Sequence, residues 1–146
     1  MKIQPCIGLD ETLFGMTQDQ VRALNGEPDE VAEDRDDGIT TVAWYYWARS
    51  LSFNFDSDVE MRLMTIEIGA DDATLAGQAV IGLSLRELQD FLRTQGLEGT
   101  EFDIDDEDGG YVTVDAWNMN FWIEDDYVTD AQWEAPLDDE GIPLWP

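Results

Sequence analysis

Carboxylates are the residues of this sequence most able to do chemistry. The 146 residues include 34 Asp and Glu, seven Lys and Arg, and no His. Carboxylate pairs can serve as the acid and base of a glycosidase, but so many acids make chance pairs frequent. Without histidine, the chain lacks the usual general base, the Ser-His and Cys-His nucleophile pairs and the commonest metal ligand. We therefore expect a protein that is not an enzyme and has no cofactor.

Acidic residues gather in two segments, 29–37 and 103–109. The second is similar to a calcium loop, but that pattern requires Gly at its sixth place and Glu at its twelfth, where this chain has Asp108 and Val114. We therefore expect no dedicated metal site. Both segments follow a predicted helix and precede a predicted strand, which suggests a use in binding; flexible, solvated turns are the alternative. The candidate partner-binding residues here are Asp36, Asp37, Asp105, Asp106, Glu107 and Asp108.

Aromatic residues give a second set of candidates. In the run 44–47, which reads Trp-Tyr-Tyr-Trp, strand alternation sends one Trp/Tyr pair to each side of a sheet. The parity is not decided by the sequence: either Trp44 with Tyr46 or Tyr45 with Trp47 leaves the helix-covered side. Trp44 and Tyr46 are included among the candidate partner-binding residues.

Trp122 has a clearer parity. It alternates with Asn120 and Glu124 on one side of a predicted strand, whereas Phe121 and Ile123 occupy the other side. An exposed Trp among acids and amides is typical of an interface hot spot. Trp122, Asn120 and Glu124 are therefore candidate partner-binding residues, and packing under the C-terminal segment or against the other half of the chain is the alternative.

Two helix starts have the same pattern. Thr17 with Gln20, and Ser84 with Glu87, each have the spacing of a capping box, in which two side chains satisfy backbone donors at a helix N-terminus. Alternating strands follow both helices, with Phe53 in the first and Phe121 in the second, 68 residues apart. We predict helices within 15–26 and 82–96.

This repeat predicts an α+β fold. It consists of two tandem helix-plus-antiparallel-strand units that form a longer sheet with helices on one face. The single domain 1–146 divides into repeat one (1–73), repeat two (74–134) and an irregular tail (135–146), with the boundary near residues 71–76. The predicted core residues are Val21, Leu24, Phe53, Phe55, Leu88, Phe91, Phe121 and Ile123.

The first helix-opening motif resembles that of two bacterial families. It consists of Gly15, Met16, Thr17, Val21, Gly26 and Pro28, with a looser second copy at Gly82, Leu83, Ser84, Leu88 and Gly96. This pattern is similar to that of β-lactamase inhibitor proteins and of small outer-membrane assembly lipoproteins. The inhibitor resemblance implies a tandem fold whose concave sheet face grips an enzyme. The chain departs from both families, because Cys6 is its single cysteine and lacks the context for lipidation.

The net charge of −27 narrows the possible partners. Such a chain repels nucleic-acid phosphates and anionic membranes, and it attracts basic protein surfaces. A lone cysteine and no apolar leader favour a soluble, cytoplasmic protein. In size and acidity the chain is similar to bacterial immunity proteins. We therefore expect an inhibitor that covers the active site of a basic, nuclease-type toxin enzyme. The alternatives are a DNA mimic or adaptor that titrates a basic protein, an envelope assembly module, and acidity that serves solubility alone.

Overall fold

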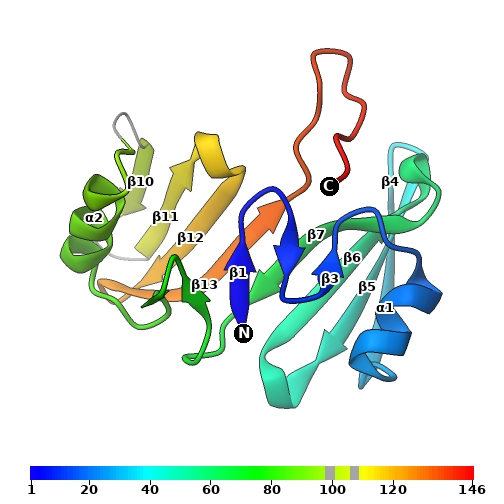
Figure 1. The fold of residues 1–146 in the computed structure, drawn as a ribbon, viewed down its shortest axis with the longest axis horizontal. Helices are drawn as coiled ribbons and strands as arrows, with labels where there is room; N and C mark the ends of the chain where they lie inside the picture. The colour runs from blue at the N-terminus through cyan, green and yellow to red at the C-terminus, as the bar shows by residue number, and fades with distance from the viewer. Residues whose placement is uncertain (98–100, 106–108) are drawn as a thin grey trace.

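The computed structural model describes residues 1–97, 101–105 and 109–146, and Figure 1 shows its fold. These residues form thirteen β-strands in two sheets, two α-helices and three short 3₁₀ helices. The 3₁₀ helices are η1 (Trp47–Arg49), η2 (Ser57–Val59) and η3 (Asp115–Trp117).

The large sheet is antiparallel throughout, with the strand order β10-β11-β12-β13-β7-β6-β5-β4. Its strands are β4 (Glu30–Asp36), β5 (Ile39–Tyr46), β6 (Leu51–Asp56), β7 (Arg62–Ile68), β10 (Glu101–Asp105), β11 (Gly109–Val114), β12 (Met119–Glu124) and β13 (Tyr127–Glu134). Its two halves meet where β13 pairs with β7, so that Ala131 lies opposite Ile68 and Gln132 opposite Glu67. One antiparallel surface therefore spans both halves of the chain.

The small sheet has the order β3-β2-β1-β8-β9 and lies in front of the middle of the large sheet in Figure 1. Its strands are β1 (Lys2–Gln4), β2 (Gly8–Leu9), β3 (Thr12–Leu13), β8 (Thr74–Leu75) and β9 (Gln78–Ala79). The strands β1 and β8 pair in parallel, with Ile3 opposite Leu75. The segment predicted as a boundary, 71–76, thus contains a strand of this sheet.

The helices α1 (Gln18–Asn25) and α2 (Leu85–Thr94) begin at the predicted capping boxes, so these two local predictions are confirmed. The Gln20 amide donates to Thr17 Oγ1 at 3.3 Å, and Thr17 N donates to Gln20 Oε1 at 2.9 Å. In α2 the corresponding distances, between Ser84 and Glu87, are 3.1 and 3.0 Å. Each pair satisfies two backbone donors that a helix start leaves free.

The predicted α+β fold of two helix-plus-strand units is wrong. More of the described residues lie in strands than in helices, they form two sheets and not one, and each half of the large sheet has four strands. The small sheet was not predicted as a sheet, because its strands have two or three residues and are too short to show a period of two. Its parallel β1–β8 pair joins segments about seventy residues apart in sequence, which local patterns do not reveal.

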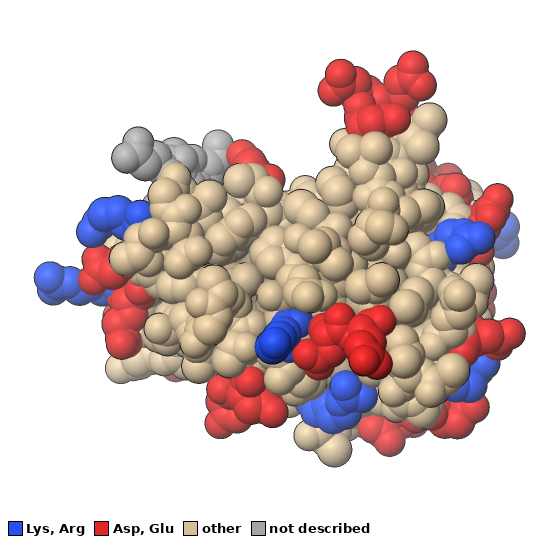
Figure 2. All heavy atoms as spheres, in the orientation of Figure 1, with Lys and Arg blue, Asp and Glu red and all other residues tan. Residues whose placement is uncertain are grey.

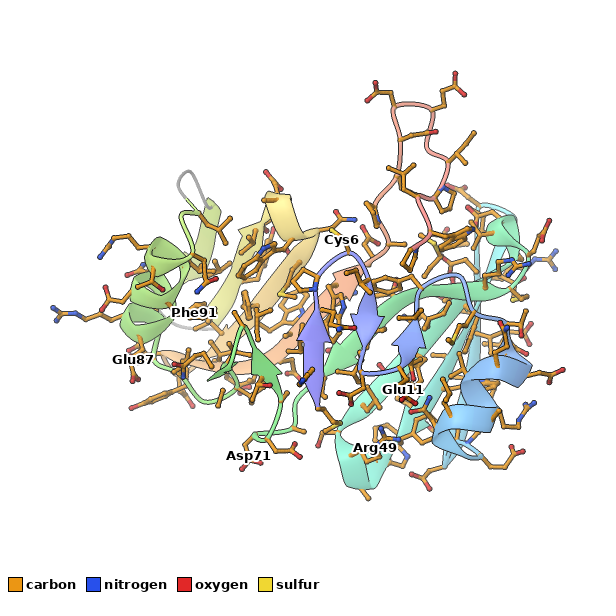
Figure 3. All side chains as sticks on the ribbon, viewed as in Figure 1. Cys6, Glu11, Arg49, Asp71, Glu87 and Phe91 are labelled. Carbon is orange, nitrogen blue, oxygen red and sulfur yellow. The ribbon has the colours of Figure 1, made fainter. Side chains whose placement is uncertain are left out.

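The core lies between the large sheet and a layer formed by α1, the small sheet and α2 (Figure 1). Trp133 of β13 crosses this interface and donates from Nε1 to the Gly8 carbonyl of β2 at 3.2 Å. The prediction that Leu24 belongs to the core is wrong, since this residue is 45% exposed on α1. Phe91 is half-buried and packs against the Trp117 ring at 6.4 Å; Figure 3 shows it on α2. The other predicted core residues, which are buried as expected, are Val21, Phe53, Phe55, Leu88, Phe121 and Ile123.

Residues 135–146 project from the body in Figure 1 and turn back on themselves. Leu137 and Pro143 form an isolated bridge, and Asp138 Oδ1 accepts from the Ile142 amide at 2.9 Å. The returning end lies against the segment before α1, where a Cβ on Gly15 would come within 2.8 Å of the Trp145 ring. Gly15 has φ +90°, so a side chain there would meet both backbone strain and this ring.

Candidate protein-binding surface

The candidate site lies on the side of the large sheet opposite to the helices and the small sheet. Alternation in β5, β6, β7, β12 and β13 buries one set of side chains in the core and leaves the other set at least partly exposed. We call this second side the open face. Its central residues are Tyr45, Ser52, Asn54, Thr65, Glu67, Asn120, Trp122, Asp130, Gln132 and Glu134.

Aromatic side chains stand on both halves of the open face. Trp122, 37% exposed, makes a tilted contact with the Tyr111 ring at 5.3 Å and donates from Nε1 to Gln132 Oε1 at 3.4 Å. In the other half the Tyr45 and Trp47 rings stack at 4.7 Å, with planes only 8° apart. Trp47 is 57% exposed. Both pairs can therefore contribute flat apolar area to a partner without first leaving the core.

A hollow of about 250 Å³ lies beside the stacked rings. We call it the aromatic hollow; its lining residues are Tyr45, Trp47, Ser50, Leu51, Ser52, Glu67 and Asp130. Burial raises the pKa of Glu67, and the negative charge of Asp130 adds to the increase. Asp130 lies beside Gly69, where a Cβ would come within 2.6 Å of its Oδ1.

A second hollow, of about 220 Å³, occupies the equivalent place in the other half of the sheet. We call it the amide hollow; its outward-facing lining residues include Thr65, Thr113, Asp115, Asn118, Asn120, Gln132 and Glu134. Thr113 Oγ1 donates to Asn120 Oδ1 at 2.8 Å. Burial raises the pKa of Glu134, with a further increase from the charge of Asp56. This hollow is suited to hydrogen bonding, since Thr113 and Asp115 line it where Tyr45 and Trp47 line the aromatic hollow.

The correspondence between the hollows follows from the strand registers. Ser52 pairs with Glu67 in one half, and Asn120 pairs with Gln132 in the other. The turns η1 and η3 end in left-handed residues, Ser50 and Asn118. Register shifts also occur at equivalent places, after Asn54 and after Trp122. The backbone is thus alike in both places while the side chains differ.

Basic residues are concentrated away from the open face. Figure 2 shows basic side chains spread over the side formed by the helices and the small sheet, where Lys2, Arg22 and Arg93 belong to β1, α1 and α2. Within the strands of the large sheet, the basic residues are Arg35, on the edge strand β4, and Arg62. Arg62 donates to the Gly15 carbonyl at 2.8 Å, before α1. The open face is therefore acidic and aromatic.

The structure brings together only part of the predicted site. Trp122 and Asn120 lie on the open face, and Glu124 is exposed opposite Tyr127 at the end of β12. Trp44 and Tyr46 are 2% and 5% exposed, so their prediction as partner-binding residues is wrong: their parity places them in the core, against Phe55 and Phe53.

The predicted acidic residues lie at the margins. Asp36 ends the edge strand β4, and Asp37 begins its turn into β5. Asp105 ends β10, at the opposite edge of the large sheet, and residues 106–108, which include Asp106, Glu107 and Asp108, lie outside the described residues. Asp36, Asp37 and Asp105 are thus separated from Trp122 by the width of one or more strands.

Sequence reasoning missed Glu67 and Asp130 as site residues. Glu67 alternates with Ile66 and Ile68, so its outward direction could have been read from the sequence. Asp130 could not be placed in this way, because a register shift in the β12–β13 pair interrupts the alternation beside it.

No family model, curated protein or solved structure matches this chain. The resemblance to β-lactamase inhibitor proteins therefore stays a prediction, and the interpretation of the site depends on its own geometry. None of the helices in the described ranges has the length and apolar character needed to cross a bilayer.

Proposed function

We propose that this protein is a cytoplasmic inhibitor that binds a basic enzyme and covers its active site, as an immunity protein neutralises a nuclease-type toxin. The observation that carries this proposal is the open face, where the exposed Trp122 and Trp47 stand among carboxylates and amides. Trp and Tyr dominate the energy of protein interfaces, and a polar rim supplies specificity.

Charge supports the choice of partner. The net charge of −27 favours association with a cationic protein surface over any anionic one. An enzyme that binds nucleic acid must present such a surface to phosphates. Carboxylates such as Glu67 and Asp130 would occupy the place of those phosphates, and the absence of histidine favours binding over catalysis.

One observation favours a second function, that of a DNA mimic or adaptor which titrates a basic protein without blocking catalysis. All seven residues of the edge strand β4 are exposed, and four of them, Glu30, Glu33, Asp34 and Asp36, are acidic. Such a line of carboxylates offers charge without an aromatic anchor. It also opposes edge-to-edge pairing of sheets, which is the structural role of charges on an edge strand.

The test of the inhibitor proposal has two steps. The protein is used as bait at low salt, the basic protein that it retains is purified, and the activity of that protein is measured against increasing inhibitor. Stoichiometric loss of activity is the expected result, and Trp122→Ala bait should retain much less. Retention without loss of activity would favour the mimic. If no basic protein is retained, both proposals are wrong.

Association kinetics test the role of charge. If acids steer the partner, the association rate constant at low salt should approach about 10⁸–10⁹ M⁻¹s⁻¹, against about 10⁵–10⁶ for a neutral pair. It should fall steeply between about 0.01 and 0.15 M salt, as the screening length shortens from about 30 to 8 Å. The dissociation rate should change much less. An association rate insensitive to salt would mean that the acidity serves solubility alone.

A further inference from the structure

We infer that the aromatic hollow receives the guanidinium group of one arginine on the surface of the partner. This inference rests on the proposed function and names the side chain that the open face recognises. The hollow, of about 250 Å³, is smaller than the pockets of about 300–1,000 Å³ that hold drug-sized ligands. Its size therefore suits a single side chain.

The stacked rings supply the wall of the site. The Tyr45 and Trp47 planes differ by only 8°, and Trp47 is largely exposed, so a flat ring surface borders the hollow. A guanidinium group is planar and stacks on such a surface more readily than an ammonium group does. The chain already makes contacts of this kind elsewhere, because the Arg22 guanidinium carbon lies 4.9 Å from the centre of the Trp44 ring.

The carboxylates supply the charge. Glu67 and Asp130 both line the hollow, and the ion pairs found among the described residues use other acids, namely Asp19, Glu27, Glu60 and Asp90. Within the described chain, Glu67 and Asp130 thus lack a basic partner. Glu67 is half-buried, and a half-buried carboxylate beside a second one is costly until a cation neutralises it. An arginine from outside would both pair with the acids and stack on the rings.

The amide hollow is a built-in control. At the equivalent positions it has Thr113 for Tyr45, Asp115 for Trp47 and Gln132 for Glu67. Thr65 likewise takes the place of Asp130. This hollow therefore has no ring at the positions of Tyr45 and Trp47 and no carboxylate at those of Glu67 and Asp130, although Asp115 and Glu134 line it elsewhere and the backbone around it is alike. An arginine should therefore bind the aromatic hollow more tightly than the amide hollow.

The experiment uses the full chain and Nα-acetyl-argininamide as the probe. Indole N–H signals of Trp47 and Trp122 are assigned by NMR, and each is followed as the probe is added. We expect a saturable shift at Trp47 and little at Trp122. The neutral citrulline analogue should produce no such shift, and the lysine analogue should bind more weakly. A Trp47 shift no larger than that at Trp122, or equal binding of the citrulline or lysine analogue, would overturn the inference.

Matched variants complete the test. Glu67→Gln with Asp130→Asn should weaken probe binding at least about tenfold, because it removes charge-assisted hydrogen bonds. Glu134→Gln, in the amide hollow, should not. Trp47→Ala is a second variant that should lose binding, and because Trp47 is exposed the change carries little risk to folding. Since this variant has no Trp47 signal, binding is followed through the shifts of the probe itself. Unchanged probe binding in the Glu67→Gln/Asp130→Asn protein or in Trp47→Ala would overturn the inference, whereas the proposed function would stand if the purified partner were still inhibited.

Discussion

The two hollows of the open face have the same backbone and different chemistry. In each, a 3₁₀ turn ends in a left-handed residue, and the following strand sends three consecutive inward side chains into the core. Those inward positions are apolar in both halves, as Phe53 and Phe121 show. At the outward positions, Glu67 lies beside aromatic rings in one half, and Gln132 lies beside amide side chains in the other. The buried side chains thus maintain the geometry, and the exposed ones are free to specialise.

The largest expected effect tests whether the two halves have equivalent cores. Phe53→Ala and Phe121→Ala should each lower the free energy of unfolding by about 3–5 kcal/mol, because both rings are fully buried and each truncation leaves a cavity. Urea denaturation measures both values. A loss below about 1 kcal/mol in one half alone would show that the cores are not equivalent.

The second prediction concerns equivalent outward positions. Trp122→Ala should weaken partner binding by at least about 2 kcal/mol, the scale of a hot spot, and leave the melting temperature nearly unchanged. Asn54→Ala, at the position equivalent to Trp122, should change binding little. Calorimetric titration and thermal unfolding separate the two effects. Normal binding by a less stable Trp122→Ala protein would assign this ring to the core instead.

The helix starts should behave alike. Thr17→Ala and Ser84→Ala each remove one capping side chain, so each should cost about 1 kcal/mol of stability. Hydrogen exchange should quicken in α1 for the first variant and in α2 for the second. Exchange that quickens in both helices for one variant would mean that the layer over the sheet opens as a unit.

A smaller effect follows from the half-buried acids of the open face. Burial raises the pKa of Glu67, Glu134 and Asp56, so the folded state retains their protons to a higher pH than the unfolded state does. Their contribution to stability is therefore present at low pH and lost as the pH rises through the raised pKa values. We expect the melting temperature to rise as the pH is lowered from 7 toward 5, with less change in Glu67→Gln, which copies Gln132 of the other half. A melting temperature that falls over this range would contradict the prediction.

The smallest effect distinguishes the two caps. Hydrogen bonds with Ser84, first of all from its backbone, lower the pKa of Glu87, whereas the corresponding Gln20 does not titrate. The contribution of Glu87 is present above its ordinary pKa and lost as the pH falls through the lowered value. Figure 3 shows Glu87 at α2. The protection of amides against hydrogen exchange, relative to their intrinsic rates, should therefore fall in acid at the start of α2 but not of α1; equal responses would contradict this.

Local patterns predicted local structure well and long-range structure poorly. The capping boxes and the outward direction of Trp122 could be predicted, because each depends on residues within one element. Trp44 and Tyr46 could not be placed, since both parities of that strand are aromatic. Leu24 fits the apolar stripe of a helix yet lies beyond the edge of the buried layer. The hollows need strands from both halves, and no local pattern specifies that β13 pairs with β7.

The small sheet has a consequence for synthesis on the ribosome. Strand β1 needs Thr74 and Leu75 as partners, and Gly8 accepts its hydrogen bond from Trp133. One edge of β1 pairs with nearby β2, but its other edge stays unpaired until residues 74–75 have been made. A nascent chain that ends at residue 73 has half of the large sheet and the β1–β2 pair, but it lacks β8 as the second partner of β1 and β13 as the partner for the inner edge of β7. We therefore expect folding to finish late and all at once, with chaperone contact or proteolysis most frequent just before β13 is released.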